Sequence, residues 1–167
     1  MSKVLHKALD EYGIAEVSGT KYNKRVLDYF HETGHKWVTD DATAWCAAFA
    51  NWVLKECGIQ GSGKLNARSF LDTGREVKNP QQGDLVIFWR GSKSGWQGHV
   101  AFYITERDGF IYTLGGNQSD KVNISRYPKD RLLGYRRVET TQTNKVDFDI
   151  KKVTTKDLLT EVLLRIK

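Results

Sequence analysis

The chain has 167 residues, of which 40% are hydrophobic and 28% charged, and it contains only two prolines. Such a chain forms a globular domain that buries roughly 70% of its unfolded surface, so it needs no disulfide or structural metal. These values exclude disordered, collagen-like and coiled-coil proteins. No segment approaches the roughly 20 apolar residues of a membrane span, and the first ten residues lack a signal-peptide core. We therefore expect synthesis in the cytoplasm without a signal peptide, and no membrane span.

The first half of the chain predicts helices. Apolar residues recur at helical spacing in four segments, namely residues 4–12, 23–33, 43–57 and 66–71. Gly13, Gly34 and Gly58 follow the first three segments, where glycine commonly ends a helix.

The second half of the chain predicts strands. Five segments carry strand patterns, namely residues 84–89, 98–105, 110–114, 121–127 and 132–138. Asp108-Gly109 is a hairpin turn signal between the second and third of them. Helices followed by hairpin-joined strands predict an α+β fold with an antiparallel sheet.

The two cysteines, Cys46 and Cys57, lie eleven residues apart on one predicted helix. At about 1.5 Å per residue they are roughly 16 Å apart, beyond the ~7 Å limit for a disulfide, so they cannot pair. No CxxC spacing occurs, and the one HExxH match, His31-Glu32-Thr33-Gly34-His35, contains the glycine expected to end its helix, so its two histidines would not share one helix face. We assign no metal and no cofactor.

The positive charge is concentrated late in the chain. The net charge is +6 and the pI about 9.3, and residues 120–137 hold six Lys or Arg against two Asp. This stretch looks like a β-hairpin with a basic face, which is either simply solvated or binds an anionic polymer. No helix-turn-helix, zinc-finger or aromatic RNA-platform motif occurs, so we expect no nucleic-acid partner.

One thiol and one imidazole are placed for chemistry. Cys46 lies in the first turn of its helix, where free N–H groups and the helix dipole should lower the pKa of a thiol, whereas Cys57 lies at the opposite end. His99 begins a strand and could serve as the base that a thiol nucleophile needs. When each residue is considered alone, Cys46 could instead be a small buried apolar residue, and His99 a hydrogen-bonded histidine at the end of a strand.

Five motifs occur together in a fixed order. They are Trp45-Cys46-Ala-Ala-Phe49, the segment from Pro80 to Phe88, Gly98-His99-Val100-Ala-Phe-Tyr103, Leu114-Gly-Gly-Asn117-Gln118 and Leu132-Leu-Gly-Tyr-Arg136. The set resembles the CHAP and NlpC-type papain-like peptidases and amidases of peptidoglycan, especially compact phage- and prophage-encoded members. The resemblance covers about residues 8–137. It implies N-terminal helices, with the Cys-bearing helix packed on an antiparallel sheet that carries the His.

The resemblance also implies roles for three residues. Cys46 would be the nucleophile, His99 the general base and acid, and Asn117 the polar group that orients the imidazole. The thiolate would attack an amide carbonyl, His99 would protonate the leaving amine, and water would hydrolyse the thioester. The backbone N–H of Cys46 is one natural donor for the oxyanion.

The choice of Asn117 depends on the strand register. If Asp108-Gly109 is a two-residue turn, Arg107 pairs with Phe110 and Gln118 lies opposite His99. A one-residue bulge, for which Gly115-Gly116 is suited, brings Asn117 opposite instead. We take Asn117 as the orienting residue and keep Gln118 as the alternative.

Further residues are candidates for substrate contact or metal binding. We expect Glu16, Trp45, Trp96 and Gln118 to contact substrate. Trp37 and Trp89 could also stack on sugar rings, although protein cores and sheet edges use tryptophan as well. Asp40-Asp41 is similar to the acidic calcium loops of some CHAP domains, but two adjacent carboxylates do not form a six-oxygen shell.

We expect a catalytic domain over residues 1–137 and a strand-helix extension over residues 138–167. The apolar stripe Leu158, Leu159, Val162, Leu163 and Ile166 should dock on the catalytic domain, on a second copy in a homodimer, or on a phage-particle or membrane partner, with the first two favoured over the membrane.

The expected function is a peptidoglycan hydrolase, either an N-acetylmuramoyl-L-alanine amidase or an endopeptidase of the stem or cross-bridge. It would act on the cell wall after phage lysis, injection or release. The alternatives are a catalytically silent structural or wall-binding phage component, and a thiol amidase or deamidase toxin that acts on protein.

Overall fold

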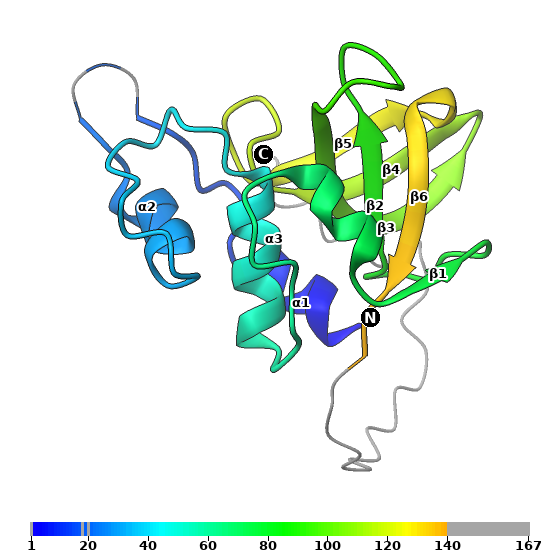
Figure 1. The fold of residues 1–167 in the computed structure, drawn as a ribbon, viewed down its shortest axis with the longest axis horizontal. Coiled ribbons are helices and arrows are strands. Elements are labelled where there is room, and N and C mark those ends of the chain that lie inside the picture. The colour runs from blue at the N-terminus through cyan, green and yellow to red at the C-terminus, as the bar shows by residue number, and fades with distance from the viewer. Residues whose placement is uncertain (1, 18, 20, 140–167) are drawn as a thin grey trace.

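The computed structural model describes residues 2–17, 19 and 21–139 (Figure 1). Its helical elements are α1 (Lys3–Leu9), α2 (Lys24–His31), α3 (Cys46–Glu56) and the 3-10 helices η1 (Ala67–Asp72) and η2 (Lys129–Arg131). Its strands are β1 (Arg75–Val77), β2 (Leu85–Trp89), β3 (Gly98–Arg107), β4 (Phe110–Gly115), β5 (Asn123–Pro128) and β6 (Leu132–Arg137). The α+β class is confirmed. The expected strand-helix extension lies outside the described residues, apart from its first two.

Short polar side chains begin three of the helical segments. The hydroxyl of Ser2 accepts a hydrogen bond from the N–H of Leu5 at 3.1 Å, and caps α1. Asn23 caps α2 and Asn66 caps η1 through their side-chain oxygens in the same way. Each cap satisfies an N–H group that the first turn of a helix leaves free, which fixes where the segment starts.

The sheet is antiparallel throughout, with strand order β1-β6-β2-β3-β4-β5. The basic hairpin expected over residues 120–137 is therefore wrong, because β5 and β6 are strands but do not pair with each other. Four strand spacings separate them, about 19 Å in a flat sheet. The link from Pro128 to Leu132 reaches at most about 14 Å, so the sheet must curl. The Tyr127 ring of β5 accordingly stacks on the Phe88 ring of β2, with centroids 4.7 Å apart.

The curled sheet has two apolar faces. One face packs against the helices, which gather on one side of the sheet in Figure 1, and Val100 and Phe102 of β3 belong to this larger cluster. The smaller cluster lies on the other face, around Val86, Phe88 and Tyr135. No helix among the described residues is long and apolar enough to cross a membrane.

Helix α3 is the centre of the larger cluster. All residues from Cys46 to Leu54 are buried. Gly116, just after β4, lies directly against this helix, and a Cβ built there would be 2.6 Å from the Cβ of Phe49 and 2.7 Å from Cζ3 of Trp45. Only a residue without a side chain fits between the end of β4 and α3.

We predict that Gly116→Ala lowers the free energy of unfolding by about 1–3 kcal/mol, because Phe49 and Trp45 must shift to admit a methyl group. Gly134→Ala is the matched control, since its Cβ meets only Cδ2 of Leu71 at 3.4 Å, an ordinary contact. Urea denaturation of both variants measures the difference. Equal stability of the two variants would contradict the close packing at Gly116.

Candidate active site

Cys46 is the first residue of α3, and both it and Cys57 are free thiols. The side chain of Cys46 is almost fully buried at 7% exposure. Burial raises the pKa of the Cys46 thiol, while hydrogen bonding from the backbone N–H groups of Val100 and Ala47 opposes the rise. The expected lowering of this pKa by the helix start is therefore wrong: the loss of solvation outweighs the N–H groups and the dipole.

His99 is the second residue of β3 and is 4% exposed. Side chains alternate along a strand, so His99 faces away from α3 while Val100 faces toward it. Its ring lies against that of Tyr127, with centroids 5.0 Å apart. Burial lowers the pKa of His99 to about 4, and the charge of Arg90 adds to this shift. The imidazole is therefore neutral at pH 7.

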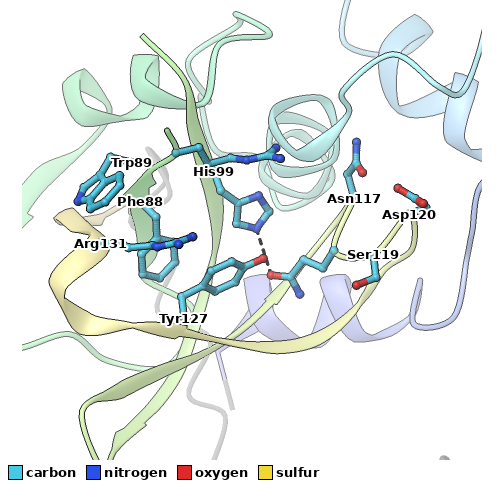
Figure 2. A pocket seen from close by; sticks show the side chains of 10 residues that line it. Phe88, Trp89, His99, Asn117, Ser119, Asp120, Tyr127 and Arg131 are labelled. Atoms are coloured by element: carbon cyan, nitrogen blue, oxygen red, sulfur yellow. Dashed lines mark hydrogen bonds between the residues drawn. The ribbon is translucent and has the colours of Figure 1, made fainter. Parts of the chain in front are cut away.

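Two cavities meet at His99. Cys46 and His99 both line the smaller one, of about 170 Å³, together with Arg90, Trp96 and Asn117. His99, Arg90 and Asn117 also line the larger one, of about 370 Å³, which extends toward Tyr127 (Figure 2). The structure thus brings the proposed nucleophile and base to one hollow, with a second chamber on the other side of the imidazole.

Gln118 holds the imidazole by hydrogen bonding. Its Oε1 lies 3.1 Å from Nε2 of His99, the contact dashed in Figure 2, and accepts a second hydrogen bond from the hydroxyl of Thr113 at 3.1 Å. Its Nε2 donates to the carbonyl of Asn123 at 2.6 Å, which identifies the other amide atom as oxygen. Since oxygen only accepts, Nε2 of neutral His99 carries the proton and Nδ1 is free to accept one.

The structure replaces Asn117 by Gln118 as the partner of His99. β3 and β4 do shift register by one residue, but between Tyr103 and Thr105 rather than at Gly115-Gly116. That register would bring Asn117 opposite His99 if β4 continued. Instead β4 ends at Gly115, and Asn117 takes a left-handed φ of 54°. Its side chain points away from the imidazole in Figure 2, and the turn brings the buried Gln118 side chain to His99.

The four residues expected to contact substrate have different surroundings. Trp45 is fully buried, so the structure contradicts a substrate contact for it, and its indole N–H donates to Glu16 at 2.6 Å. Glu16 lies outside the residues that line the two cavities, and burial raises its pKa. Gln118 is 2% exposed and is engaged with His99. Trp96 alone is both exposed, at 74%, and beside Cys46 in the smaller cavity.

The acidic pair Asp40-Asp41 ties loops together. Asp41 accepts hydrogen bonds from the N–H groups of Val17 and Asn23, and Asp40 accepts two from Thr43. Within residues 2–17, 19 and 21–139, no group of three or more His, Cys, Asp or Glu side chains could hold a metal ion.

Sequence reasoning missed two residues of the site, Arg90 and Tyr127. Arg90 follows β2 directly and lines both cavities. No sequence motif around Arg90 indicated that it would lie near Cys46 and His99. Tyr127 is brought to His99 only by the curl of the sheet, for which the sequence has no local pattern.

The loop between β2 and β3 is held by Arg68 of η1. The Arg68 guanidinium donates to three loop carbonyls, those of Gln97 at 2.8 Å, Lys93 at 2.9 Å and Ser92 at 3.0 Å. A planar guanidinium can serve three acceptors at once, whereas an ammonium is a point donor. Arg68 thereby positions the loop that carries Trp96.

We predict that at pH 7 the imidazole of His99 is neutral with its proton on Nε2, and that it titrates near pH 4. The ¹⁵N chemical shifts of the ring measure both properties. Gln118→Ala should let the proton redistribute between the ring nitrogens because the fixed acceptor is lost, and Asn117→Ala should leave the tautomer unchanged. A proton on Nδ1 in the unaltered protein would contradict the hydrogen-bond assignment.

We also predict that Arg68→Gln increases tryptic cleavage after Lys93 at least about tenfold, since three hydrogen bonds to a charged group are lost. Arg75→Gln is the control, because Arg75 makes an exposed ion pair with Glu139 away from this loop. Mass spectrometry of timed digests identifies the cut. Unchanged cleavage in Arg68→Gln would show that other contacts hold the loop.

Comparisons with known proteins agree with this description. The CHAP domain model matches residues 38–117, which include Cys46, His99 and Asn117. No curated protein matches the chain significantly.

The solved structures that the chain is similar to include two NlpC/P60 proteins. One, from Staphylococcus aureus subsp. aureus Mu50, is described as similar to a lipoprotein of the NLP/P60 family, with 23% identity, a TM-score of 0.41, and coverage of 73% of this chain and 44% of that one. This chain thus spans less than half the length of that protein. RipD of Mycobacterium tuberculosis, described as a non-catalytic NlpC/p60 domain protein adapted to peptidoglycan binding, shows 18% identity, a TM-score of 0.44, and coverage of 80% and 92%.

The CHAP match suggests a relation to peptidoglycan hydrolysis, and the Cys-bearing helix on an antiparallel sheet is the papain-like α+β arrangement expected from the sequence. Residues 38–117 are thus similar to the CHAP domain family.

Proposed function

We propose that this protein is a cysteine hydrolase that cleaves an amide bond of peptidoglycan. The observation that carries the proposal is the shared cavity of Cys46 and His99, with an imidazole whose free Nδ1 is set by Gln118. A buried thiol beside a base with a fixed tautomer is the arrangement that thiol acyl transfer requires.

The pKa directions suggest how the reaction starts. Because the thiol pKa is raised and the imidazole pKa lowered, both groups are neutral before attack. Nδ1 of His99 then accepts the thiol proton as Sγ of Cys46 forms a bond to the carbonyl carbon, so proton transfer accompanies attack. The backbone N–H of Cys46 at the start of α3 is a donor for the oxyanion.

The second half of the reaction uses the same imidazole in reverse. The imidazolium of His99 returns its proton to the leaving amine, which breaks the carbon–nitrogen bond and leaves a thioester on Cys46. A water molecule loses a proton to Nδ1 as it attacks the thioester, and the thiol is regenerated together with a carboxylic acid. Gln118 accepts the Nε2–H throughout, so we propose it, in place of Asn117, as the positioning residue for His99.

The bond proposed for cleavage is either the sugar-to-peptide amide or a peptide bond of the stem or cross-bridge. Mass spectrometry of muropeptides released from purified sacculi distinguishes them, because the new termini identify the bond. A silent wall-binding protein would bind the sacculi and release nothing.

We predict that Cys46→Ala lowers the rate of muropeptide release by at least about 10³-fold, because no thioester can form. Cys57→Ala should retain most of the activity, since Cys57 is the C-cap of α3, at the opposite end of the helix from Cys46 and outside the residues that line the cavity.

Sacculus hydrolysis by equal amounts of both variants measures the effect, with circular dichroism as the check on folding. Full activity of Cys46→Ala would remove Cys46 as the nucleophile. Absence of any release by the unaltered protein, with binding retained, would favour the silent wall-binding function.

A further inference from the structure

Two arginines converge on the larger cavity beside His99. Arg90 follows β2 and Arg131 ends η2, so the curl of the sheet brings them together from distant positions in the sequence. Figure 2 shows Arg131 reaching across Phe88 toward the centre of the cavity. The aromatic side chains of Phe88, Trp89 and Tyr127 complete this side of the cavity, which we call the arginine chamber.

The positive charge of this chamber is not neutralised by the fold. Four of the nine arginines in the described part of the chain pair with carboxylates, namely Arg25 with Glu11, Arg75 with Glu139, Arg107 with Asp108 and Arg137 with Asp84. Among the described residues, neither Arg90 nor Arg131 makes such an ion pair. Arg131 is held against the Trp89 ring, 5.5 Å from its centroid, an interaction that leaves its N–H donors available.

The field of Arg90 reaches the reacting groups. Its charge acts to lower the pKa of Cys46 and of His99, and both arginines act to lower the pKa of Tyr127 against the larger effect of burial. An anionic group of the substrate would therefore meet two charged donors within the same space as the imidazole. Asp120 lines the chamber as well, and Figure 2 shows it on the opposite side from Arg131.

We propose that the arginine chamber binds a free carboxylate of the substrate peptide through Arg90 and Arg131. Guanidinium groups bind carboxylates by paired N–H donors, and a flanking aromatic wall suits the apolar carbons that carry such a carboxylate. The inference rests on the proposed function, because it names the substrate group that lies beside the scissile amide.

The position of the arginine chamber also indicates which half of the substrate carries the carboxylate. Cys46 lines the smaller cavity, so the scissile carbonyl lies on that side of His99. His99 delivers its proton to the leaving amine, so the half that carries this amine extends past the imidazole into the chamber. The residue that supplies the amine is thus the acidic one.

The test compares two muropeptide substrates that differ only in whether this carboxyl group is free or amidated. The unaltered protein should cleave the free acid with a kcat/KM at least about tenfold higher, the usual effect of a charge-assisted contact. Arg90→Gln and Arg131→Gln should lose this preference, with a rise in KM for the free acid that reduces its advantage over the amidated substrate.

Arg126→Gln is the matched control. Arg126 also lies over an aromatic ring, 4.6 Å from the centroid of Phe110, but it lies outside the residues that line the chamber. This variant should keep the full preference for the free acid. A preference that survives in both chamber variants, or is lost equally in Arg126→Gln, would overturn the proposal.

Binding measurements distinguish a failure of this proposal from a failure of the proposed function. Calorimetric titration of Cys46→Ala with the same two muropeptides should show tighter binding of the free acid, and Arg90→Gln or Arg131→Gln added to that protein should abolish the difference. Preferential binding without hydrolysis by the unaltered protein would support the chamber and refute the hydrolase. Hydrolysis with equal binding and cleavage of both substrates would refute the chamber alone.

Discussion

The amide of Gln118 is the interaction on which the site depends. Its nitrogen is committed to the Asn123 carbonyl at 2.6 Å, so its oxygen can only face His99 and Thr113. Rotation of the side-chain amide would break its hydrogen bonds to His99, Thr113 and Asn123, and the backbone carbonyl of Gln118 also accepts from the Asn123 side chain at 2.7 Å. A buried polar network that is fully satisfied is rigid. The ring orientation and proton position of His99 follow from this network.

Burial then sets the chemistry that this geometry can perform. Removing Cys46 and His99 from water favours the uncharged form of each, and this outweighs the N–H groups at the start of α3. The free protein therefore holds a neutral pair, and in the proposed reaction charge develops only when substrate occupies the cavity. Donors that are fixed in place before that moment need no reorganisation as the oxyanion forms.

The sequence predicted the elements that depend on local residue patterns, but it did not predict the features that depend on contacts between distant parts of the chain. Helix α3 and strands β2 to β4 lie within a few residues of their predicted bounds, since periodicity and turn signals determine them. The three-residue strand β1 is too short to show a period. The sequence favoured Asn117 over Gln118 as the partner of His99. A bulge near Tyr103 shifts the β3–β4 register, and the turn after Gly115 then brings Gln118 rather than Asn117 to His99. Trp45 lies next to the proposed nucleophile in sequence, but its side chain is fully buried in the core.

The short η2 link has a consequence for how the protein folds. The chamber walls come from β2, β3, the turn after β4, β5 and η2, and they meet only when the sheet has curled far enough for η2 to bridge β5 and β6. Such contacts between distant parts of a chain form late, because the entropy of closing large loops must be overcome first. The space beside His99 therefore exists only once the sheet has closed. Substrate that fits this space would stabilise the closed sheet selectively.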